Sequence, residues 1–460
     1  MAGKWRGSFQ GRVWNPGCFG IATVILGLAL VAGGCDSGNG NRLFIGPTAS
    51  PTRRPATATP TPGPTGTPSP VVSPTTAPSV TPTPAGPTPT SSGPTATATP
   101  ARVALWVENT GSSNGTSNTG FVAEFTGGTL TSPGATVAPT PTVQNMSAAI
   151  AADTSGVNFD NSDNQWVSVC GHKGPPLDFG RIAQFNTATL AGLKANPKPT
   201  PDILLSDDGT GKLVSCPWAT TFDSAGDMWV ANSNQNVGPG GFVTEYQPAQ
   251  LVAPGGHPTP FMTLTDSADK LVSPTGVVFD STGAHLVVSD FGSAQFGGAT
   301  AGQILIFNTA TLPTTGGTHD VKASAKLTDP SIGSPVNGAF DASGNLWIAD
   351  CSVSEIYMFP KAALGTGAVS ATIIFKAVTV TGTGEQSLNC PAGITFDSAG
   401  NLWYTNFFGV AASVNGAVGE FSKAQLAGPS GTPQPAIFLK ADTSGNALNF
   451  PLGLNFGPQH

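Results

Sequence analysis

Polar side chains recur at the ends of five short apolar runs, and they are the first candidates for chemistry. The five are Asn109, Asn232, Asp290, Asp350 and Asn406. If these runs are strands of one ring, the side chains surround one face near its axis, where amides and carboxylates could hold a polar ligand or a weak Ca²⁺ ion. The alternative is structural, because Asn and Asp at strand ends also bond to turn backbone. Both interpretations remain open from the sequence.

Trp218 is a sixth candidate for ligand binding. It stands at a repeat position where the other copies carry small or aliphatic residues, namely Ser155, Thr275, Val336, Ala392 and Leu452. At the mouth of a central channel an indole could stack on a ligand, and plain packing is the alternative.

Motifs for catalysis are missing from the sequence. The five histidines are scattered, and no nucleophile elbow, phosphate loop or H-E-x-x-H motif is present. We therefore assign no catalytic residue, no metal site and no cofactor beyond weak Ca²⁺. Glu124, Glu245 and Glu420 recur before an aromatic residue and are expected to be solvated. Whether the protein is an enzyme stays open, with binding favoured.

A repeated hairpin must position these residues. Phe396–Trp403 reads Phe-Asp-Ser-Ala-Gly-Asn-Leu-Trp, near copies begin at Phe222 and Phe340, and weaker copies begin at Phe159 and Phe279. The apolar flanks are typical of strands. Asp suits the first position of a type I turn, and Gly suits the later position where φ is positive. Each copy therefore predicts a β-hairpin.

Each hairpin is followed by a third strand ending in an aromatic residue, a short turn and a fourth strand. Four antiparallel strands repeated radially are typical of a β-propeller. The last copy, 451–456, stops after one strand, and the first, 105–109, begins at the second strand. We therefore predict an all-β, six-bladed propeller that pairs its N- and C-terminal strands in one blade. The recurring tryptophans (Trp106, Trp166, Trp229, Trp347 and Trp403) are expected to pack between blades.

Composition divides the chain into segments 1–35, 36–101 and 102–460. Segment 1–35 has a basic start and an apolar run of about fifteen residues, which is short for a membrane span. The run ends in small residues directly before Cys35, as in a bacterial lipobox, so we expect a signal peptide and lipidation at Cys35. A plain signal peptide or an uncleaved anchor is the alternative.

Segment 36–101 is expected to be a disordered linker. Residues 47–101 hold 16 Pro and 16 Thr and no aromatic residue, so they cannot bury a core. Segment 102–460 has 13 lysines and arginines against 25 acidic residues, a net charge of −12. This charge argues against nucleic acid as a partner and against membrane contact other than through the lipid anchor.

Four cysteines of segment 102–460 occupy matching repeat positions. Cys170 and Cys351 each lie four residues after a repeat tryptophan, and Cys216 and Cys390 directly precede the equivalent prolines. Export permits disulfides. Of the three possible connectivities, repeat symmetry favours Cys170–Cys216 and Cys351–Cys390. A metal site is the rival interpretation, but the C-x-x-C spacing is missing.

The string Pro-x-Gly-apolar-x-Phe-Asp-x-x-Gly-Asn-Leu-Trp-apolar-Ala-Asp/Asn resembles NHL repeats over residues 102–460. The wider group is similar to gluconolactonase-like propellers and to streptogramin lyase. This resemblance implies a six-bladed propeller and, for the lactonases, a divalent metal held in the channel, notably by an Asn before the Gly of the first strand. In this chain that position is the one occupied by Trp218, and Asn337 stands one place later, in the Gly position.

These observations predict an exported, lipid-anchored propeller in the periplasm or at the cell surface. Its expected function is that of a binding or scaffold module for a protein or carbohydrate ligand that the sequence does not identify. The alternative is a lactonase- or lyase-like hydrolase that uses the polar rim of the central channel.

Overall fold

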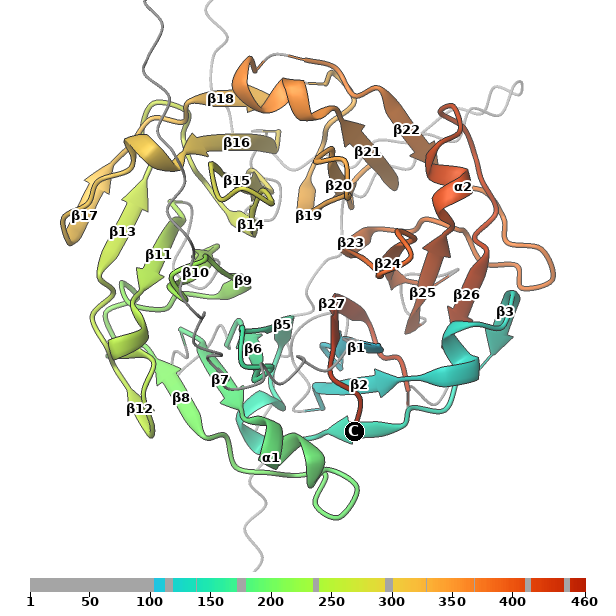
Figure 1. Ribbon diagram of the computed structural model, residues 1–460, viewed down its shortest axis with the longest axis horizontal. Coiled ribbons are helices and arrows are strands. Elements are labelled where there is room, and N and C mark those ends of the chain that lie inside the picture. Colours follow the sequence, from blue (N-terminus) through green and yellow to red (C-terminus); the bar gives the residue numbers. More distant parts are fainter. Residues whose placement is uncertain are drawn as a thin grey trace, which may run out of the picture. The chain divides into compact units, whose positions relative to one another are not determined.

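The computed structural model describes residues 103–460, apart from 112–118, 138, 172–178, 235–239, 294–300, 328, 368, 410–414 and 442–446. The expected signal peptide with Cys35 and the expected linker lie outside the described residues. Six sheets surround a central axis in the described part (Figure 1). The fold is therefore an all-β, six-bladed propeller, which confirms the prediction from the repeats.

Each blade contains four antiparallel strands, which follow one another from the axis outward. Blade 1 comprises β27 (Pro451–Gly457), β1 (Ala104–Asn109), β2 (Phe121–Phe125) and β4 (Val143–Asn145). Blade 2 comprises β5 (Thr154–Phe159), β6 (Gln165–Val169), β7 (Arg181–Phe185) and β8 (Ile203–Ser206). Blade 3 comprises β9 (Pro217–Phe222), β10 (Met228–Asn232), β11 (Phe242–Tyr246) and β13 (Met262–Thr265).

The second half of the ring repeats this order. Blade 4 comprises β14 (Pro274–Phe279), β15 (His285–Asp290), β16 (Gln303–Asn308) and β18 (Ala325–Leu327). Blade 5 comprises β19 (Pro335–Phe340), β20 (Leu346–Asp350), β21 (Glu355–Phe359) and β22 (Ile373–Lys376). Blade 6 comprises β23 (Pro391–Phe396), β24 (Leu402–Phe408), β25 (Asn415–Phe421) and β26 (Ile437–Lys440).

Short helical turns follow the third strands, and the turn at 148–150 leads from the outermost strand of blade 1 to the innermost strand of blade 2. They are the α-helices α1 (Thr187–Ala191) and α2 (Lys423–Leu426), and the 3₁₀ turns η1 (Gly127–Leu130), η2 (Ala148–Ile150), η3 (Pro248–Gln250), η5 (Thr309–Thr311) and η6 (Lys361–Gly365). No helix in the described ranges is both long and apolar enough to cross a membrane.

The hairpin turns have the predicted geometry. In blade 6 one oxygen of the Asp397 carboxylate accepts the N–H groups of Ala399 (2.9 Å) and Asn401 (2.8 Å), and the other accepts the indole N–H of Trp403 (3.2 Å). Gly400 has a φ of 86°, where a Cβ would be strained. The turn carboxylate therefore organises the turn and orients the tryptophan at the same time.

That tryptophan packs on the next blade, as predicted. In five interfaces its ring lies against a phenylalanine near the end of the innermost strand of the next blade. The centroid distances are 5.9 Å for Trp106–Phe159, 5.7 Å for Trp166–Phe222, 5.7 Å for Trp229–Phe279, 6.4 Å for Trp347–Phe396 and 6.1 Å for Trp403–Phe456. One residue type thus links each of these hairpins to its neighbour.

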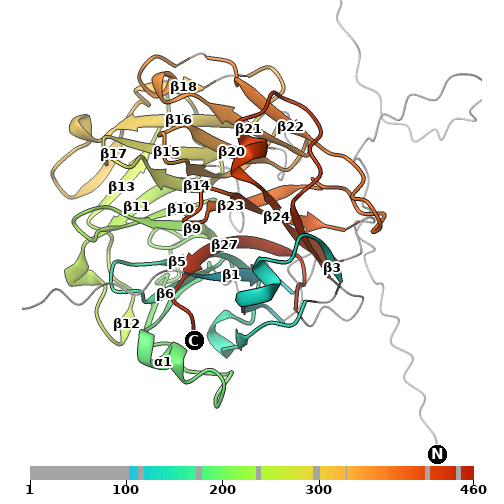
Figure 2. The same ribbon diagram turned by 45° about the vertical axis from the view of Figure 1, so that its right-hand side comes forward.

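The two ends of the propeller chain close the ring. β27 pairs antiparallel with β1, with Leu105 opposite Phe456 and Ala104 opposite Gly457, and Figures 1 and 2 show the two strands side by side. The innermost strand of blade 1 therefore comes from the C-terminus and its other strands from the start of the domain, as predicted.

Additional strands extend three blades in a way the repeats did not indicate. β3 (Gly134–Val137), β12 (Gly255–Gly256) and β17 (Gly317–Asp320) each leave their own blade and pair in parallel with the outermost strand of the preceding one. Gly255 shows why glycine is needed, because a Cβ there would lie 2.3 Å from the carbonyl oxygen of Leu204. These strands cover edges that would otherwise be open.

Both predicted disulfides are present. Cys170 is bonded to Cys216, and Cys351 to Cys390. Each bond joins the end of one blade's second strand to the start of the next blade's innermost strand, so blade 2 is linked to blade 3 and blade 5 to blade 6.

Candidate functional site

The five polar strand-end residues lie inside the blades. Asp350 is fully buried, and its carboxylate accepts the N–H groups of Gly333 (2.8 Å), Ser334 (3.0 Å) and Ser352 (3.1 Å). These contacts hold the segment that leads into the innermost strand of blade 5. The carboxylate therefore works as a cap for backbone donors that would otherwise be buried without acceptors.

The other four residues repeat this contact, each within its own blade. Their side-chain oxygens accept the N–H of Ser273 for Asp290 (2.7 Å), of Ser215 for Asn232 (2.9 Å), of Asn389 for Asn406 (3.0 Å) and of Asn449 for Asn109 (2.8 Å). All four are buried. These contacts are those of the structural alternative, and ligand binding by this rim remains a prediction.

Trp218 lies among apolar residues of the innermost strands. It packs, partly buried, with Val336 of blade 5, Ala392 of blade 6 and Leu452 of blade 1. These residues occupy the same repeat position on the innermost strands, so Trp218 belongs to an apolar cluster there.

A row of polar contacts links the innermost strands at another level. The Asn455 amide donates to Asn158 Oδ1 (2.7 Å), and the Asn158 amide donates to the Thr220 carbonyl (2.6 Å). Thr395 Oγ1 donates to Asn455 Oδ1 (3.4 Å). Four blades are joined in this way, so these polar groups also contribute to closing the ring.

The third-strand glutamates are buried, and the expectation that they are solvated was wrong. Glu124 is 0% exposed and Glu245 and Glu420 are 5% exposed. Each lies directly opposite a repeat tryptophan on the neighbouring strand, as Glu245 does with Trp229, so the indole covers the carboxyl. Burial raises the pKa of each to about 7.

Glu108 is a further buried acid, at the closure of the ring. One of its oxygens accepts the N–H of Gly453 on β27 (3.0 Å), and burial raises its pKa to about 8. The carboxyl is therefore mostly neutral at pH 7 and can fasten the C-terminal strand without a buried charge.

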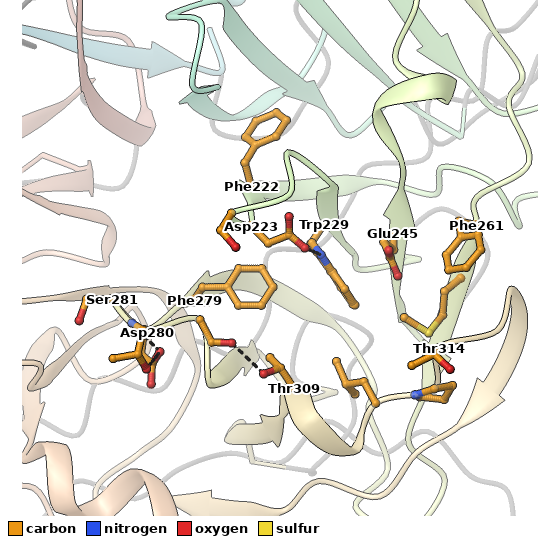
Figure 3. Close-up of a pocket in the computed structure, with 16 residues that line it drawn as sticks. Phe222, Asp223, Trp229, Glu245, Phe261, Phe279, Asp280, Ser281, Thr309 and Thr314 are labelled. Carbon is orange, nitrogen blue, oxygen red and sulfur yellow. Dashed lines mark hydrogen bonds between the residues drawn. The ribbon is translucent and has the colours of Figure 1, made fainter. Parts of the chain in front are cut away.

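A cavity of about 470 Å³ lies between blades 3 and 4, and it is called the blade 3–4 pocket below. Figure 3 shows sixteen residues that line it. From blade 3 they are Phe222, Asp223, Ser224, Trp229, Glu245, Phe261 and Met262. From blade 4 they are Phe279, Asp280, Ser281, Thr282, Gly283, Thr309, Leu312, Pro313 and Thr314. The size is that of a pocket for a small ligand.

Pro313 marks a difference between the connection that lines this cavity and the equivalent connection of blade 6. In blade 6 the equivalent leucine, Leu426, ends helix α2, is followed by Ala427 in helical geometry and is buried. In blade 4 the residue after Leu312 is Pro313, which disfavours helical geometry at the preceding residue. Leu312 is accordingly extended (φ −66°, ψ 149°) and only partly buried. Leu426 is therefore buried in blade 6, whereas the equivalent Leu312 of blade 4 is only partly buried and lines the cavity.

Acidic groups dominate the charge of this pocket. Asp223 accepts the indole N–H of Trp229 (3.3 Å), and Asp280 bonds to His285 Nδ1 (2.7 Å). The pKa of Glu245 is raised by burial and then by the charges of Asp227 and Asp223. None of the sixteen lining residues is a lysine or arginine. The pocket therefore combines aromatic walls with carboxyl groups that could act as hydrogen-bond donors or acceptors.

In the described part of the chain, no three His, Cys, Asp or Glu side chains are grouped so that they could hold a metal ion.

The sequence did not indicate the blade 3–4 pocket. The available signals were the Leu312–Pro313 pair and the glutamate at position 245, where blade 5 carries Met358.

No model of a protein family matches this chain, and no curated protein matches it. Solved structures resemble its fold. A periplasmic gluconolactonase of Pseudomonas aeruginosa is 14% identical with a TM-score of 0.43, over 77% of this chain and 99% of that one. A gluconolactonase of Xanthomonas campestris is 15% identical with a TM-score of 0.34, over 55% of this chain and 69% of that one.

A virginiamycin B lyase of Staphylococcus aureus is also similar. It is 12% identical with a TM-score of 0.35, and the match covers 59% of this chain and 67% of that chain. The likeness to all three concerns the propeller fold.

Proposed function

We propose that this protein is an exported, lipid-anchored binding module whose ligand site is the blade 3–4 pocket. The observation that carries the proposal is the pocket itself, about 470 Å³ with Trp229 and three phenylalanines in its lining and with carboxyl groups among them. Aromatic walls with a few convergent polar groups are the usual chemistry of small-molecule sites.

Export and anchoring rest on two features. The disulfides Cys170–Cys216 and Cys351–Cys390 suit a chain that folds in an oxidising compartment. The lipobox-like ending at Cys35 supports the anchor. Cys35→Ala should release the mature protein from the membrane fraction. If this variant is still processed to normal size and still sediments with membranes, the anchor lies elsewhere.

Catalysis at the central channel is the alternative to this proposal. A lactonase- or lyase-like site would need oxygens that converge on a metal or a substrate. The oxygens of Asp290 and Asp350 instead accept backbone N–H groups, and Trp218 belongs to an apolar cluster at the axis. A panel of lactones, assayed with and without Ca²⁺, should therefore show no turnover. Turnover lost in Asp290→Asn would revive the hydrolase alternative.

The pocket is tested by blocking it at an exposed position. Ser281→Trp would place an indole over the blade 3–4 pocket, and Ser398→Trp is the matched control, at the same turn position of blade 6. A suitable panel is glucose, N-acetylglucosamine, 2-phenylethanol, phenethylamine and 3-phenylpropionate, measured by ligand-observed NMR. At least one probe should bind the parent protein and the Ser398→Trp control, and Ser281→Trp should lose it. If no probe depends on residue 281, the assignment of this pocket is wrong.

A further inference from the structure

The blade 3–4 pocket is lined with acids, and none of its sixteen lining residues is a lysine or arginine. Asp223, Glu245 and Asp280 contribute to its wall, and Figure 3 shows Asp223 beside Trp229, with Asp280 and Ser281 on the blade 4 side. Aromatic rings and hydroxyl groups make up most of the rest. The whole folded segment is also acidic, with a net charge of −12. A ligand that enters therefore meets a negative potential both from the acids of the pocket and from the folded segment as a whole.

Glu245 of this pocket interacts with a second acid, Asp227, which is not among the lining residues. Glu245 shares a hydrogen bond with Asp227, and burial together with neighbouring negative charge raises the pKa of both groups. With a pKa of about 7, Glu245 is partly protonated near neutral pH, because burial disfavours its ionised form and the charges of Asp227 and Asp223 add to that effect. A cation nearby would let Glu245 ionise, whereas a neutral sugar would leave the repulsion unchanged.

Trp229 supplies the second element of a cation site. Its indole lines the same cavity as Glu245, and its N–H is already bonded to Asp223. Its ring also packs on Phe279, so the part of the ring surface that lines the cavity is what a ligand can contact, and indole gives the strongest cation–π attraction among the aromatic side chains. Phe261 and Phe279 add apolar surface for the body of such a ligand.

We propose that the blade 3–4 pocket binds an organic cation, with an ammonium or guanidinium group at Glu245 and Trp229 and an apolar body against the phenylalanines. This inference deepens the proposed function and rests on it, because it gives a chemical class to the ligand of the same pocket. The ligand could be a free amine or the side chain of a lysine or arginine, because the same cationic group would be recognised in each case.

Three probes of nearly equal shape test the charge. Phenethylamine is cationic, 2-phenylethanol is neutral and 3-phenylpropionate is anionic between pH 6 and pH 8. Titration calorimetry on the purified protein at pH 8 should show phenethylamine bound at least about tenfold more tightly than 2-phenylethanol, and no binding of 3-phenylpropionate. Because the cation favours ionised Glu245, its affinity should fall about tenfold from pH 8 to pH 6.

Variants separate Glu245 from the other acids. Glu245→Gln should weaken phenethylamine at pH 8 by about tenfold and remove most of the dependence on pH. Glu420→Gln is the matched control, since Glu420 also has a pKa of about 7 but belongs to blade 6. A pH dependence that survives Glu245→Gln would overturn the role of Glu245.

The outcomes distinguish the two proposals. If 2-phenylethanol or a sugar binds as well as phenethylamine, and Ser281→Trp abolishes that binding, the pocket stands and the cation inference falls. If binding of phenethylamine is the same in Ser281→Trp as in Ser398→Trp, both proposals fall. If a neutral probe binds and phenethylamine shows no measurable affinity, the inference that the ligand is a cation is also rejected.

Discussion

The interface between blades 3 and 4 and the interface between blades 5 and 6 are built from the same repeat and differ in how they are filled. In both, a turn aspartate receives the indole N–H of a tryptophan, and the tryptophan packs on the next blade's phenylalanine. At blades 5 and 6, Trp347 also contacts Phe375 (5.8 Å), and Leu426 closes the cluster. At blades 3 and 4 the matching space is a cavity.

Few residues account for this difference. Blade 5 has Met358 where blade 3 has Glu245, and blade 6 has Leu426–Ala427 where blade 4 has Leu312–Pro313. The Cys351–Cys390 disulfide also spans the interface between blades 5 and 6, whereas Ser233 and Ser273 hold the equivalent positions between blades 3 and 4. The repeat therefore maintains the ring through the Trp–Asp–Phe contacts, and variation outside those contacts is free to create a site.

Loss of the disulfide should have the largest effect of the changes considered. The double variant Cys351→Ser/Cys390→Ser opens a loop with a sequence separation of 39 residues and should lower the free energy of unfolding by ~4 kcal/mol. Urea unfolding without reductant measures this. The double variant Cys170→Ser/Cys216→Ser is the control, because its separation of 46 predicts almost the same loss. A loss below ~1 kcal/mol for both would show that the bonds do not limit the unfolded chain.

Truncating the two tryptophans should separate the filled interface from the open one. Trp347→Ala should cost ~3–4 kcal/mol, because Trp347 is enclosed by Phe375, Phe396 and Leu426 and leaves a void. Trp229→Ala should cost ~1–2 kcal/mol less, since Trp229 borders the blade 3–4 pocket and has fewer packing contacts to lose. Thermal and urea unfolding of the pair give the difference. Equal losses would mean that Trp229 is packed as completely as Trp347.

Replacing Glu245 with the residue of the filled interface should change the pH dependence of stability. A carboxyl whose pKa rises from 4.5 to about 7 on folding contributes full stability below pH 4.5, and that contribution is lost as pH rises through 7. The parent protein should thus be less stable at pH 8 than at pH 5. Glu245→Met should reduce this loss and gain on the order of 1–2 kcal/mol at pH 8, after allowance for solvent in the pocket.

Glu420→Gln is the comparison for that change. It removes a similar titration in blade 6 without filling the pocket, so it should reduce the pH dependence without an added gain from apolar burial. Glu108, with a pKa of about 8, should keep part of the slope in both variants. A parent protein that is more stable at pH 8 than at pH 5 would contradict the assignment of these buried acids.

The sequence was sufficient for those parts of the fold that repeat. The copies of Phe396–Trp403 predicted the hairpins, the incomplete first and last copies predicted closure by β1 and β27, and the matched cysteines predicted both disulfides. The parallel strand β17 was not predictable in the same way. Its residues are mostly exposed, so they carry no apolar alternation, and its partner β13 belongs to another blade.

The candidate site was harder to predict for a physical reason. Charge alone suggested that Glu245 is solvated, and only the strand register puts it opposite Trp229. The cavity borders Leu312, whose side chain is only partly buried. How deeply this leucine is buried depends on its extended backbone geometry rather than on its residue type. For the strand-end residues, the sequence left two roles open, and the backbone contacts of Asp350 illustrate the structural one.

The smallest expected change in stability belongs to Pro313→Ala, which tests the cause of the difference between the interfaces. Without the proline, Leu312 can take the helical geometry that precedes Ala427 in blade 6 and turn into the cavity. Burying part of the leucine side chain should stabilise the folded state by ~1 kcal/mol. Replacing the proline makes the unfolded chain more flexible, and this should destabilise the folded state by ~0.4–1 kcal/mol. The net change should therefore be within about 1 kcal/mol of zero, while phenethylamine binding is lost. Pro433→Ala, in the corresponding connection of blade 6, should show the proline cost alone and leave binding unchanged. A crystal structure of Pro313→Ala that keeps Leu312 extended and the cavity open would show that the proline is not what opens this interface.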